Sequence, residues 1–302
     1  MKRRWVILGS AGQLGISLVR LLERALDDEV VAALDLPDVD IAERASVETA
    51  VLQSPGGPPD FVVNAAAFTH VDRCESETDA ARRVNAVAPG IVAAVCHRAG
   101  ARLAHVSTDY VFDGRARTPR REEDPAAPLS VYGWTKLEGE RAVLGVSDRF
   151  LVVRTSWLFG PGRNFVGAIL EQAARIRREG VGTPLRVVDD QVGAPTYAAD
   201  LAEGLVALLS KGRSGVYHLT NAETATWWDL ARAALDESGF TDLEIERIAT
   251  EALELPAPRP RYSLLDVSKA ARDGVVLRSW RAALSAYLRS SDAPVVRTGG
   301  PR

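Results

Sequence analysis

The sequence predicts an α/β fold in which a doubly wound parallel sheet is accompanied by a smaller, partly interleaved C-terminal domain. Three observations predict it. At the start of the chain a short apolar segment leads into a glycine-rich turn and then an amphipathic helix. Over the first half, short apolar segments alternate with helical patterns, as a parallel sheet covered on both faces requires. From about Gly160 onward the alternation is less regular.

The first element is a buried strand, residues 5–8, which is followed at once by a glycine turn at residues 9–15. The next helix has an apolar stripe at Leu14, Leu18, Leu21, Leu22 and Leu26. Such glycines let the backbone approach a pyrophosphate at the helix N-terminus. An ordinary strand-to-helix turn could have the same glycines. However, Asp35 stands 20 residues past Gly15, where an acid meets an adenosine ribose, and this context favours dinucleotide binding.

The later elements follow the same logic. Further buried strands are expected at residues 30–34, 61–65, 102–107 and 150–154. Residues 55–59 form a Pro and Gly loop, and a helical stripe then runs through Val84, Ala88, Ile91, Val92 and Val95. In the second half, helices are expected at residues 165–178, 198–209 and 226–238.

These elements suggest a division into domains. We expect residues 1–158 to form a dinucleotide-binding domain, to which residues 197–220 return. Residues 159–290 should form mainly a substrate-binding domain. Residues 291–302, rich in Pro and Gly, are expected to be a disordered tail.

Three side chains have a spacing suited to the reduction of a carbonyl. Thr108 follows a predicted strand, and Tyr132 and Lys136 are four residues apart, so on a helix they share one face about 6 Å apart along the axis. The Lys136 ammonium should lower the pKa of the Tyr132 phenol, which is normally about 10. A lone pair of this kind is common on helix surfaces. The presence of Thr108 and the glycine turn in the same chain favours a catalytic role for the Tyr132 and Lys136 pair.

Nine landmarks in order carry a resemblance to a known family. They are residues 12–15, 64–69, 71–72, 85–89, 107–114, 132–136, 154–157, 190–196 and 259–260. Over nearly the whole chain they resemble the extended short-chain dehydrogenase/reductase superfamily and, within it, the dTDP-4-dehydrorhamnose reductase family. This resemblance implies a Rossmann-like nucleotide-binding domain and a nicotinamide cofactor, NADPH or NADH.

The resemblance also implies roles for individual residues. The cofactor would contact Gly9, Gly12, Gln13, Leu14, Gly15, Asp35, Asp40, Ile41, Ala67 and Thr69, with Tyr132 and Lys136 at the nicotinamide ribose. The sugar would contact Thr108, Asp109 and Trp157, with Asn164, Gln191 and Thr196 as further candidates. Two alternatives stay open. Trp157 would also suit a core position, and Asn85 could order water or Lys136, or simply bond a neighbouring loop.

The activity implied is hydride transfer to the C4 keto group of a dTDP-4-keto-6-deoxy sugar, foremost dTDP-4-dehydro-L-rhamnose. Tyr132 would be the general acid, and Thr108 would hydrogen-bond the substrate oxygen. Dehydratases of the superfamily have an Asp-Glu pair after the Thr, whereas Asp109-Tyr110 stands here, which favours simple reduction. Epimerases share the Tyr and Lys, but Trp157 and residues 190–196 fit reductases better. A 4-ketoreductase of a secondary-metabolite pathway and a non-catalytic nucleotide-binding regulatory subunit remain as alternatives.

Composition limits the partners. The 302 residues have a formal net charge of −3, which gives no general attraction for nucleic acid or an anionic membrane, so neither partner is expected. Cys74 and Cys96 form no Cys-x-x-Cys motif, and the N-terminus has no signal-peptide pattern. We therefore expect a cytoplasmic enzyme with a small nucleotide-sugar substrate.

Some features leave the cofactor, the metal content and the oligomeric state less defined. Asp35 suits the free 2′-hydroxyl of NADH, whereas the family commonly uses NADPH. No metal is expected, because the four histidines lack metal-ligand spacing. The helix after the glycine turn has no carboxylate before Glu23, so the family's acidic metal-linked dimer is not evident, and a monomer or weak homodimer is expected. Arg259 and Arg261 suit a substrate diphosphate or a solvated loop equally well.

Overall fold

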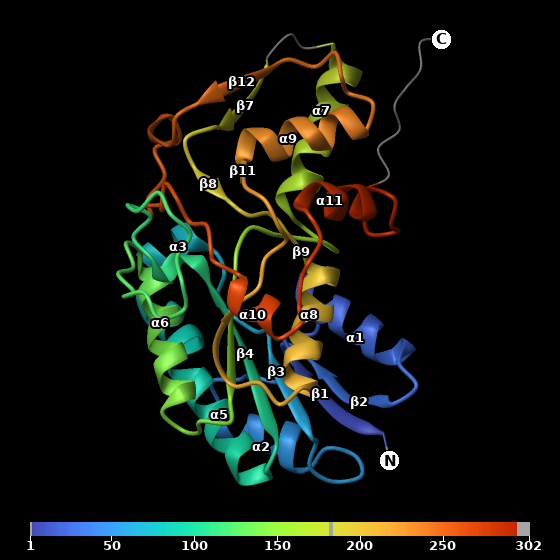
Figure 1. Cartoon of the computed structure of the whole chain (residues 1–302), viewed down its shortest axis with the longest axis vertical. Coiled ribbons are helices and arrows are strands. Elements are labelled where there is room, and N and C mark those ends of the chain that lie inside the picture. Colours follow the sequence, from blue (N-terminus) through green and yellow to red (C-terminus); the bar gives the residue numbers. More distant parts are fainter. Residues whose placement is uncertain (1, 181–183, 295–302) are drawn as a thin grey trace.

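A computed structural model of the chain describes residues 2–180 and 184–294. Its centre is a six-stranded, wholly parallel sheet with the order β2-β1-β3-β4-β5-β10 (Figure 1). The strands are β1 (Arg3–Leu8), β2 (Asp28–Leu34), β3 (Phe61–Asn64), β4 (Arg102–Thr108), β5 (Leu151–Thr155) and β10 (Gly215–His218). The predicted doubly wound parallel sheet is confirmed. The strand order reverses between β1 and β3, which makes this point the expected ligand site of such a sheet.

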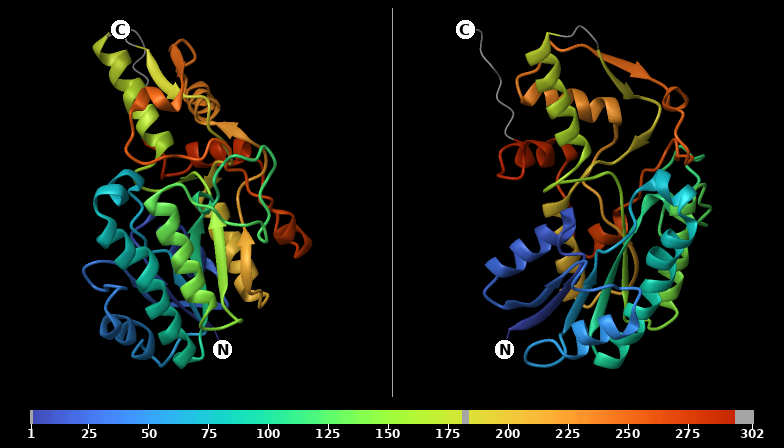
Figure 2. Two further views of the ribbon diagram at one scale, coloured as in Figure 1. Left: turned by 90° about the vertical axis from the view of Figure 1, so that its left-hand side faces the viewer. Right: turned by 180° about the vertical axis from the view of Figure 1, so that it is seen from behind.

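Helices cover both faces of this sheet (Figure 2). On one face lie α1 (Gln13–Arg24) and α8 (Ala198–Ser210), and on the other lie α2 (Arg44–Leu52), α5 (Ala88–Ala99) and α6 (Val131–Leu144). Because side chains alternate along a strand, Trp5 and Ile7 of β1 join the first core, whereas Val6 and Leu8 join the second. Leu18 and Leu22 of the predicted apolar stripe are fully buried, but Leu26 is 89% exposed, since α1 ends before it.

The remaining elements pack beyond the carboxyl ends of the sheet. Helices α7 (Phe165–Glu179), α9 (Trp227–Glu237) and α11 (Trp280–Leu288) surround a separate core that includes Trp280 and Phe240. Three two-stranded sheets accompany them: β6 (Leu158–Phe159) with β9 (Thr196–Tyr197), β7 (Leu185–Val188) with β12 (Ile245–Ile248), and β8 (Val192–Gly193) with β11 (Ala225–Thr226). The helices predicted near 165–178, 198–209 and 226–238 are confirmed as α7, α8 and α9.

Short helices complete the chain. They are α3 (Val71–Ser76), α4 (Thr78–Arg82), the π-helix η1 (Arg83–Val87), the 3-10 helices η2 (Asp109–Val111) and η3 (Thr250–Leu253), and α10 (Ser268–Arg272). The predicted helical stripe from Val84 to Val95 thus begins in η1 and continues in α5. π-Helical turns of this kind occur frequently at functional sites.

Residues 256–266, called the strap below, connect η3 to α10 and form no helix or named strand. The backbone of this strap pairs with two other segments, through bridges from Leu265 to Arg120 and from Tyr262 to Val192. Of the predicted disordered tail, residues 295–302 lie outside the described residues. Within its described part, Asp292 accepts a hydrogen bond of 2.5 Å from Arg20 of α1.

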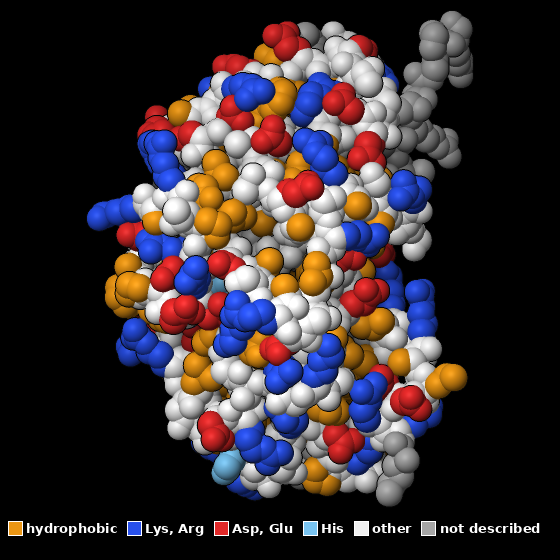
Figure 3. Space-filling view, in the orientation of Figure 1, with side chains coloured by type: hydrophobic (Ala, Val, Ile, Leu, Met, Phe, Trp, Pro, Cys, Tyr) orange, Lys and Arg blue, Asp and Glu red, His pale blue; other side chains and the backbone are white. Residues whose placement is uncertain are grey.

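Within residues 2–180 and 184–294, no helix is both long enough and apolar enough to cross a membrane. On the face shown in Figure 3, side chains of both charges are interspersed. This mixture agrees with the small formal net charge of −3.

Candidate active site

A cavity of about 690 Å³ lies at the carboxyl ends of β1, β3, β4 and β5. Every residue predicted to contact the cofactor lines it, from Gly9 of the glycine turn to Lys136 of α6. So do Thr108, Asp109 and Trp157, which were predicted to contact the sugar. The fold therefore brings the two groups of predicted residues, far apart in the sequence, to one space.

The glycine turn has the close approaches that a phosphate-binding loop needs. Gly9 has a φ of 83°, and a Cβ atom there would lie 2.5 Å from the Ala66 nitrogen. A Cβ at Gly15 would lie 2.1 Å from the Gly9 carbonyl oxygen. At Gly12, by contrast, that same oxygen would be the nearest atom to a Cβ, at 3.4 Å. No described side chain caps α1, so its first N–H groups remain available to a pyrophosphate at this helix N-terminus.

Two carboxylates stand at the ribose end of this loop. Asp35, just beyond β2, accepts hydrogen bonds from the backbone nitrogens of Ala11 at 3.0 Å and Leu36 at 2.8 Å. Asp40 accepts one from Arg83 at 2.8 Å. Burial acts to raise the pKa of Asp40, but bonds from the Ala42 backbone and Arg83 outweigh it and leave the pKa below its usual value. The residues present thus fit an adenine dinucleotide.

Helix α6 places Tyr132 and Lys136 beside Thr108 at the end of β4. Ser130 caps the helix by accepting a hydrogen bond from Gly133 at 3.2 Å, which fixes the first turn. Lys136 is only 2% exposed, and its Nζ donates to the Val106 carbonyl oxygen at 2.6 Å. Burial lowers the pKa of Lys136 to about 8, against the opposing effect of Glu140.

The expectation that Lys136 lowers the pKa of Tyr132 was wrong for this structure. Burial raises the pKa of the Tyr132 phenol, and nearby Asp109 raises it further, while Thr108 acts in the opposite direction. The Lys136 ammonium instead bonds Val106, so its charge is directed to the sheet backbone. A neutral phenol that keeps its proton can serve as a proton donor.

Behind Lys136 lies a buried ionic network. Arg154 of β5 makes a bidentate pair with Glu140 of α6, at 2.9 and 2.7 Å, and Ser107 donates to the same carboxylate at 2.5 Å. Both charged side chains are at most 5% exposed. This network fixes α6 against β4 and β5, and thereby the position of Tyr132 and Lys136 over the sheet.

Asp109 is the third carboxylate at the cavity. It is 2% exposed, and one of its oxygens has no hydrogen-bond partner among the described residues. Burial raises the pKa of Asp109 to about 6, although Ser263 of the strap and Thr108 act to lower it. A buried acceptor left free beside Thr108 suits a sugar hydroxyl.

For Asn85, the structure shows the loop contact. Its amide accepts from the Phe68 nitrogen at 2.8 Å and donates to the Phe68 oxygen at 3.0 Å. Phe68 lies between Ala67 and Thr69, both of which line the cavity. Asn85 therefore shapes the predicted cofactor loop by holding its backbone.

Aromatic rings form the other side of the cavity. Trp157, just after β5, stacks on Trp227 of α9 with ring centroids 3.9 Å apart and planes 9° apart. Both rings line the cavity. Sequence reasoning missed Trp227, because it is 70 positions from Trp157 and only the tertiary fold brings the rings together.

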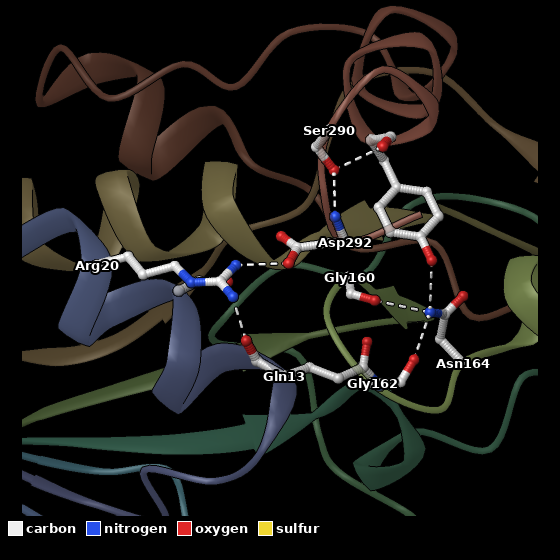
Figure 4. Close-up of polar contacts among 9 residues, drawn as sticks. Gln13, Arg20, Gly160, Gly162, Asn164, Ser290 and Asp292 are labelled. Carbon is white, nitrogen blue, oxygen red and sulfur yellow. Dashed lines mark hydrogen bonds and ion pairs between the residues drawn. The ribbon is translucent and has the colours of Figure 1, made fainter. Parts of the chain in front are cut away.

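Three predicted sugar contacts are placed elsewhere, since none of Asn164, Gln191 and Thr196 is among the cavity-lining residues. Asn164 caps α7 through Gly167, and its amide nitrogen donates to the Gly160 carbonyl at 2.7 Å and to Tyr287 at 2.9 Å (Figure 4). Gln191 bonds the Trp227 indole, and Thr196 donates from its backbone to the Trp157 carbonyl. These three residues form hydrogen bonds with other residues of the protein. Any effect on the cavity would therefore pass through those residues.

The strap arginines have partners of their own. Arg259 makes a bidentate pair with Asp72 of α3, at 2.9 and 2.7 Å, and Arg261 pairs with Glu251. In the described residues, then, both are bound to carboxylates. A second residue that sequence reasoning passed over is Arg163, which lines the cavity above the glycine turn; its backbone oxygen accepts a hydrogen bond from Gln13 at 3.3 Å.

The doubly wound sheet, the glycine turn and the Thr108, Tyr132 and Lys136 group define an oxidoreductase of the extended short-chain dehydrogenase/reductase class. Residues 3–292 match the family described as RmlD substrate binding domain, and the chain belongs to this family.

Relatives agree with this membership. A dTDP-4-dehydrorhamnose reductase of Streptomyces griseus is 43% identical over 290 residues, covering 93% of this chain and 92% of that protein. A dTDP-4-keto-6-deoxy-D-glucose reductase of Streptomyces niveus is 40% identical over 94% of this chain and 96% of its own length. The solved dTDP-4-dehydrorhamnose reductase of Bacillus anthracis in complex with NADP has a TM-score of 0.85 at 30% identity, covering 95% of this chain and 99% of that one.

Proposed function

We propose that this protein is an NADPH- or NADH-dependent reductase of the C4 keto group of a dTDP-4-keto-6-deoxy sugar, with dTDP-4-dehydro-L-rhamnose as the foremost substrate. The observation that carries the proposal is the meeting of Thr108, Tyr132 and Lys136 with the glycine turn at one cavity. The relatives named dTDP-4-dehydrorhamnose reductase and dTDP-4-keto-6-deoxy-D-glucose reductase support the substrate class.

When bound, the reduced nicotinamide would supply the hydride. Tyr132 holds the proton that the C4 oxygen must receive, and its raised pKa keeps the phenol protonated near neutrality. The Thr108 hydroxyl can donate to the same oxygen and stabilise the charge that develops there. Lys136 would hold the nicotinamide ribose through the N–H groups that its bond to Val106 leaves free, and Asp109 would accept from a sugar hydroxyl.

The experiment is the loss of NADPH and NADH absorbance with dTDP-4-dehydro-L-rhamnose, for the native protein and for Tyr132→Phe. We expect turnover with the native protein and a loss of about 10²- to 10⁴-fold in kcat for the variant, which lacks the general acid. The variant should still bind the cofactor. Turnover that survives the substitution unchanged would contradict the role of Tyr132.

Two other functions would give different results in the same assay. A 4-ketoreductase of a secondary-metabolite pathway would act on dTDP-4-keto-6-deoxy-D-glucose or a more highly deoxygenated ketosugar, and would leave dTDP-4-dehydro-L-rhamnose largely unreduced. A non-catalytic regulatory subunit would bind nucleotide but turn over none of these substrates, and would co-purify with a larger catalytic protein.

The monomer or weak homodimer and the cytoplasmic location also stay proposals. The mixed surface charge and the small net charge support a protein without nucleic-acid or membrane partners. Sedimentation of the purified protein tests the oligomeric state, and fractionation of cells tests the location. For the cofactor, the position of Asp35 at the end of β2 supports NADH, while the NADP complex of the Bacillus anthracis relative supports NADPH.

A further inference from the structure

Trp227 and Trp157 form one rigid aromatic wall beside the catalytic groups. Thr108 pairs in register with Thr155 across β4 and β5, and Trp157 stands two residues beyond Thr155. Trp157 and Trp227 line the same cavity as Thr108, whose hydroxyl would hold the substrate oxygen. Phe165 packs against the Trp227 ring, with centroids 4.7 Å apart. Phe165 does not line the cavity itself, so it supports the Trp227 ring from outside the cavity.

The orientation of Trp157 is set by its backbone and by one glycine. Its φ of 47° lies in the left-handed region, which is unfavourable for a bulky residue and persists where surrounding contacts enforce it. Gly193 supplies the room, because a Cβ atom there would lie 2.6 Å from Cε2 of the Trp157 ring. The Trp157 carbonyl also accepts from the Thr196 nitrogen at 3.1 Å. Strain held in place at a cavity wall is typical of functional sites.

A chain of hydrogen bonds sets the orientation of Trp227. Its indole N–H donates to the Gln191 side-chain oxygen at 3.0 Å, and the Gln191 amide nitrogen donates to the Thr250 hydroxyl at 3.0 Å. Thr250 in turn donates to Asp190 at 2.6 Å. Gln191 is 6% exposed, so the link in contact with Trp227 is buried, while Thr250 and Asp190 are half-buried. Since the indole N–H is bonded to Gln191, which does not line the cavity, only the carbon atoms of the Trp227 ring remain to contact a ligand.

An apolar wall in this cavity would distinguish sugars by the group that they have at C6. In a 4-keto-6-deoxy hexose, C6 is a methyl group two bonds from C4, and it can pack on indole carbons. In a 6-hydroxy hexose, the C6 hydroxyl would contact the same carbons. It would lose its hydrogen bonds to water and form none with the protein there. We propose, on the basis of the reductase function given above, that Trp227 is a specificity residue for the 6-deoxy position, and that Gln191 is the positioning residue that holds it.

The test compares the binding of dTDP-6-deoxy-D-glucose and dTDP-D-glucose, which differ only in the C6 hydroxyl, by quenching of protein fluorescence and by competition. We expect the native holoenzyme to prefer the 6-deoxy ligand by about 10- to 100-fold, the range that an apolar pocket achieves against an added hydroxyl. In Trp227→Leu this ratio should fall to within about threefold, while the Kd of NADPH stays unchanged. Trp227→Phe, which keeps an aromatic ring, should lie between.

Trp228 offers a matched control one residue along α9. It is also a half-buried tryptophan, but its N–H donates to the Ile245 carbonyl and its ring stacks under Arg247, away from the cavity-lining set. Trp228→Leu should keep the native preference for the 6-deoxy ligand. Gln191→Leu should lower the preference, and Gln191→Glu, which keeps an acceptor for the indole, should restore most of it.

The outcomes separate this inference from the proposed function. If both nucleotides bind and Trp227→Leu keeps the native ratio, or if Trp228→Leu loses it equally, the specificity role is overturned while the reductase stands. If the native protein binds neither nucleotide, the substrate class itself is overturned, and the specificity role with it. Binding is measured without turnover, so an inactive variant still reports on the wall.

Discussion

The cavity has one end at the glycine turn, proposed to bind the cofactor, and another at Trp157 and Trp227, proposed to bind the sugar. At the cofactor end, the glycine turn and the first turn of α1, which would hold the phosphates through backbone N–H groups, are contiguous in sequence. At the sugar end, side chains from β4, the segment after β5, α9 and the strap meet only in the folded protein. The phosphate-binding part of the cofactor end thus depends on local conformation, whereas the sugar end depends on tertiary packing.

This difference predicts where substitutions should act. A change at the cofactor end should alter cofactor binding directly and leave the C-terminal core intact. A change at the sugar end should act through the contacts that hold the wall and the strap in place, and should spare the cofactor. The two ends should therefore be separable by experiment, and each prediction below tests that separation.

The largest effect is expected at the glycine turn. In Gly15→Ala the new Cβ would lie 2.1 Å from the Gly9 carbonyl and 2.6 Å from Cα of Ser10, so the turn must shift. We expect the Kd of NADPH to rise by at least about 100-fold, since the first N–H groups of α1 lose their alignment. Gly167→Ala in α7 is the control, because a Cβ atom there would lie 3.7 Å from its nearest neighbour, the Asn164 side chain, and Gly167 does not line the cavity. Equal losses in the two variants, measured by calorimetry, would refute the turn geometry.

The two ends should also have separate pH dependences. The pKa of Lys136 is lowered to about 8 by burial, so its ammonium is present below that pH and lost above it. Cofactor binding should weaken as the pH rises through 8. The pKa of Asp109 is raised to about 6, again by burial, so its carboxylate is lost as the pH falls through 6, and the KM of the sugar should rise there.

The Kd of the cofactor well above pH 8 and the KM of the sugar well below pH 6 should each rise by about 10- to 100-fold. This factor corresponds to the free energy of a hydrogen bond to a charged group. Asp109→Asn provides the control. It should flatten the acidic limb of the KM profile and keep the alkaline limb of the cofactor Kd. If Asp109→Asn altered both the pH dependence of the sugar KM and that of the cofactor Kd, a single ionisable group would govern both ends of the cavity.

The same contrast explains what the sequence could predict. The strands, the parallel sheet and the main helices follow from apolar periods and turn residues, which are local signals. The glycine turn was placed correctly because its residues are consecutive. A resemblance in the segment 190–196 identified Gln191 and Thr196, but not the direction of their contacts. Only the fold shows that they hold Trp157 and Trp227 rather than line the cavity.

The pKa of Tyr132 was misjudged for a related reason. A spacing of four residues shows that Lys136 is near, but spacing carries no information on burial. In the folded protein, burial is the largest influence on the phenol, and it raises the pKa. Trp227 had no local signal at all, because its role depends on a ring 70 positions away. The sequence therefore predicts sites made of consecutive backbone groups well, and it predicts the burial and tertiary contacts of a side chain poorly.

A smaller effect is expected at the strap. Arg259 is bidentate with Asp72 and its side chain is 13% exposed, whereas the Arg261 and Glu251 side chains are each 65% exposed. Arg259→Lys cannot reproduce the paired geometry, so it should lower the stability by about 1 kcal/mol and the Tm by about 2–4 °C. It should raise the KM of the sugar several-fold and leave the Kd of NADPH alone. Arg261→Lys should change none of these, and a cofactor defect in Arg259→Lys would show that the ends are coupled.

The smallest effect is expected from Arg163. This residue lines the cavity, and its backbone oxygen accepts a hydrogen bond from Gln13, so we expect its exposed side chain to reach a phosphate of the cofactor. It is exposed, and an exposed charge pair is worth about 0.2–1 kcal/mol. Arg163→Ala should therefore raise the Kd of NADPH by about two- to fivefold at low salt and by less at high salt, because salt screens the attraction. Arg178→Ala, near the C-terminal end of α7, the helix that begins two residues after Arg163, should leave the Kd unchanged. An equal loss in both variants would assign the effect to net charge instead of position.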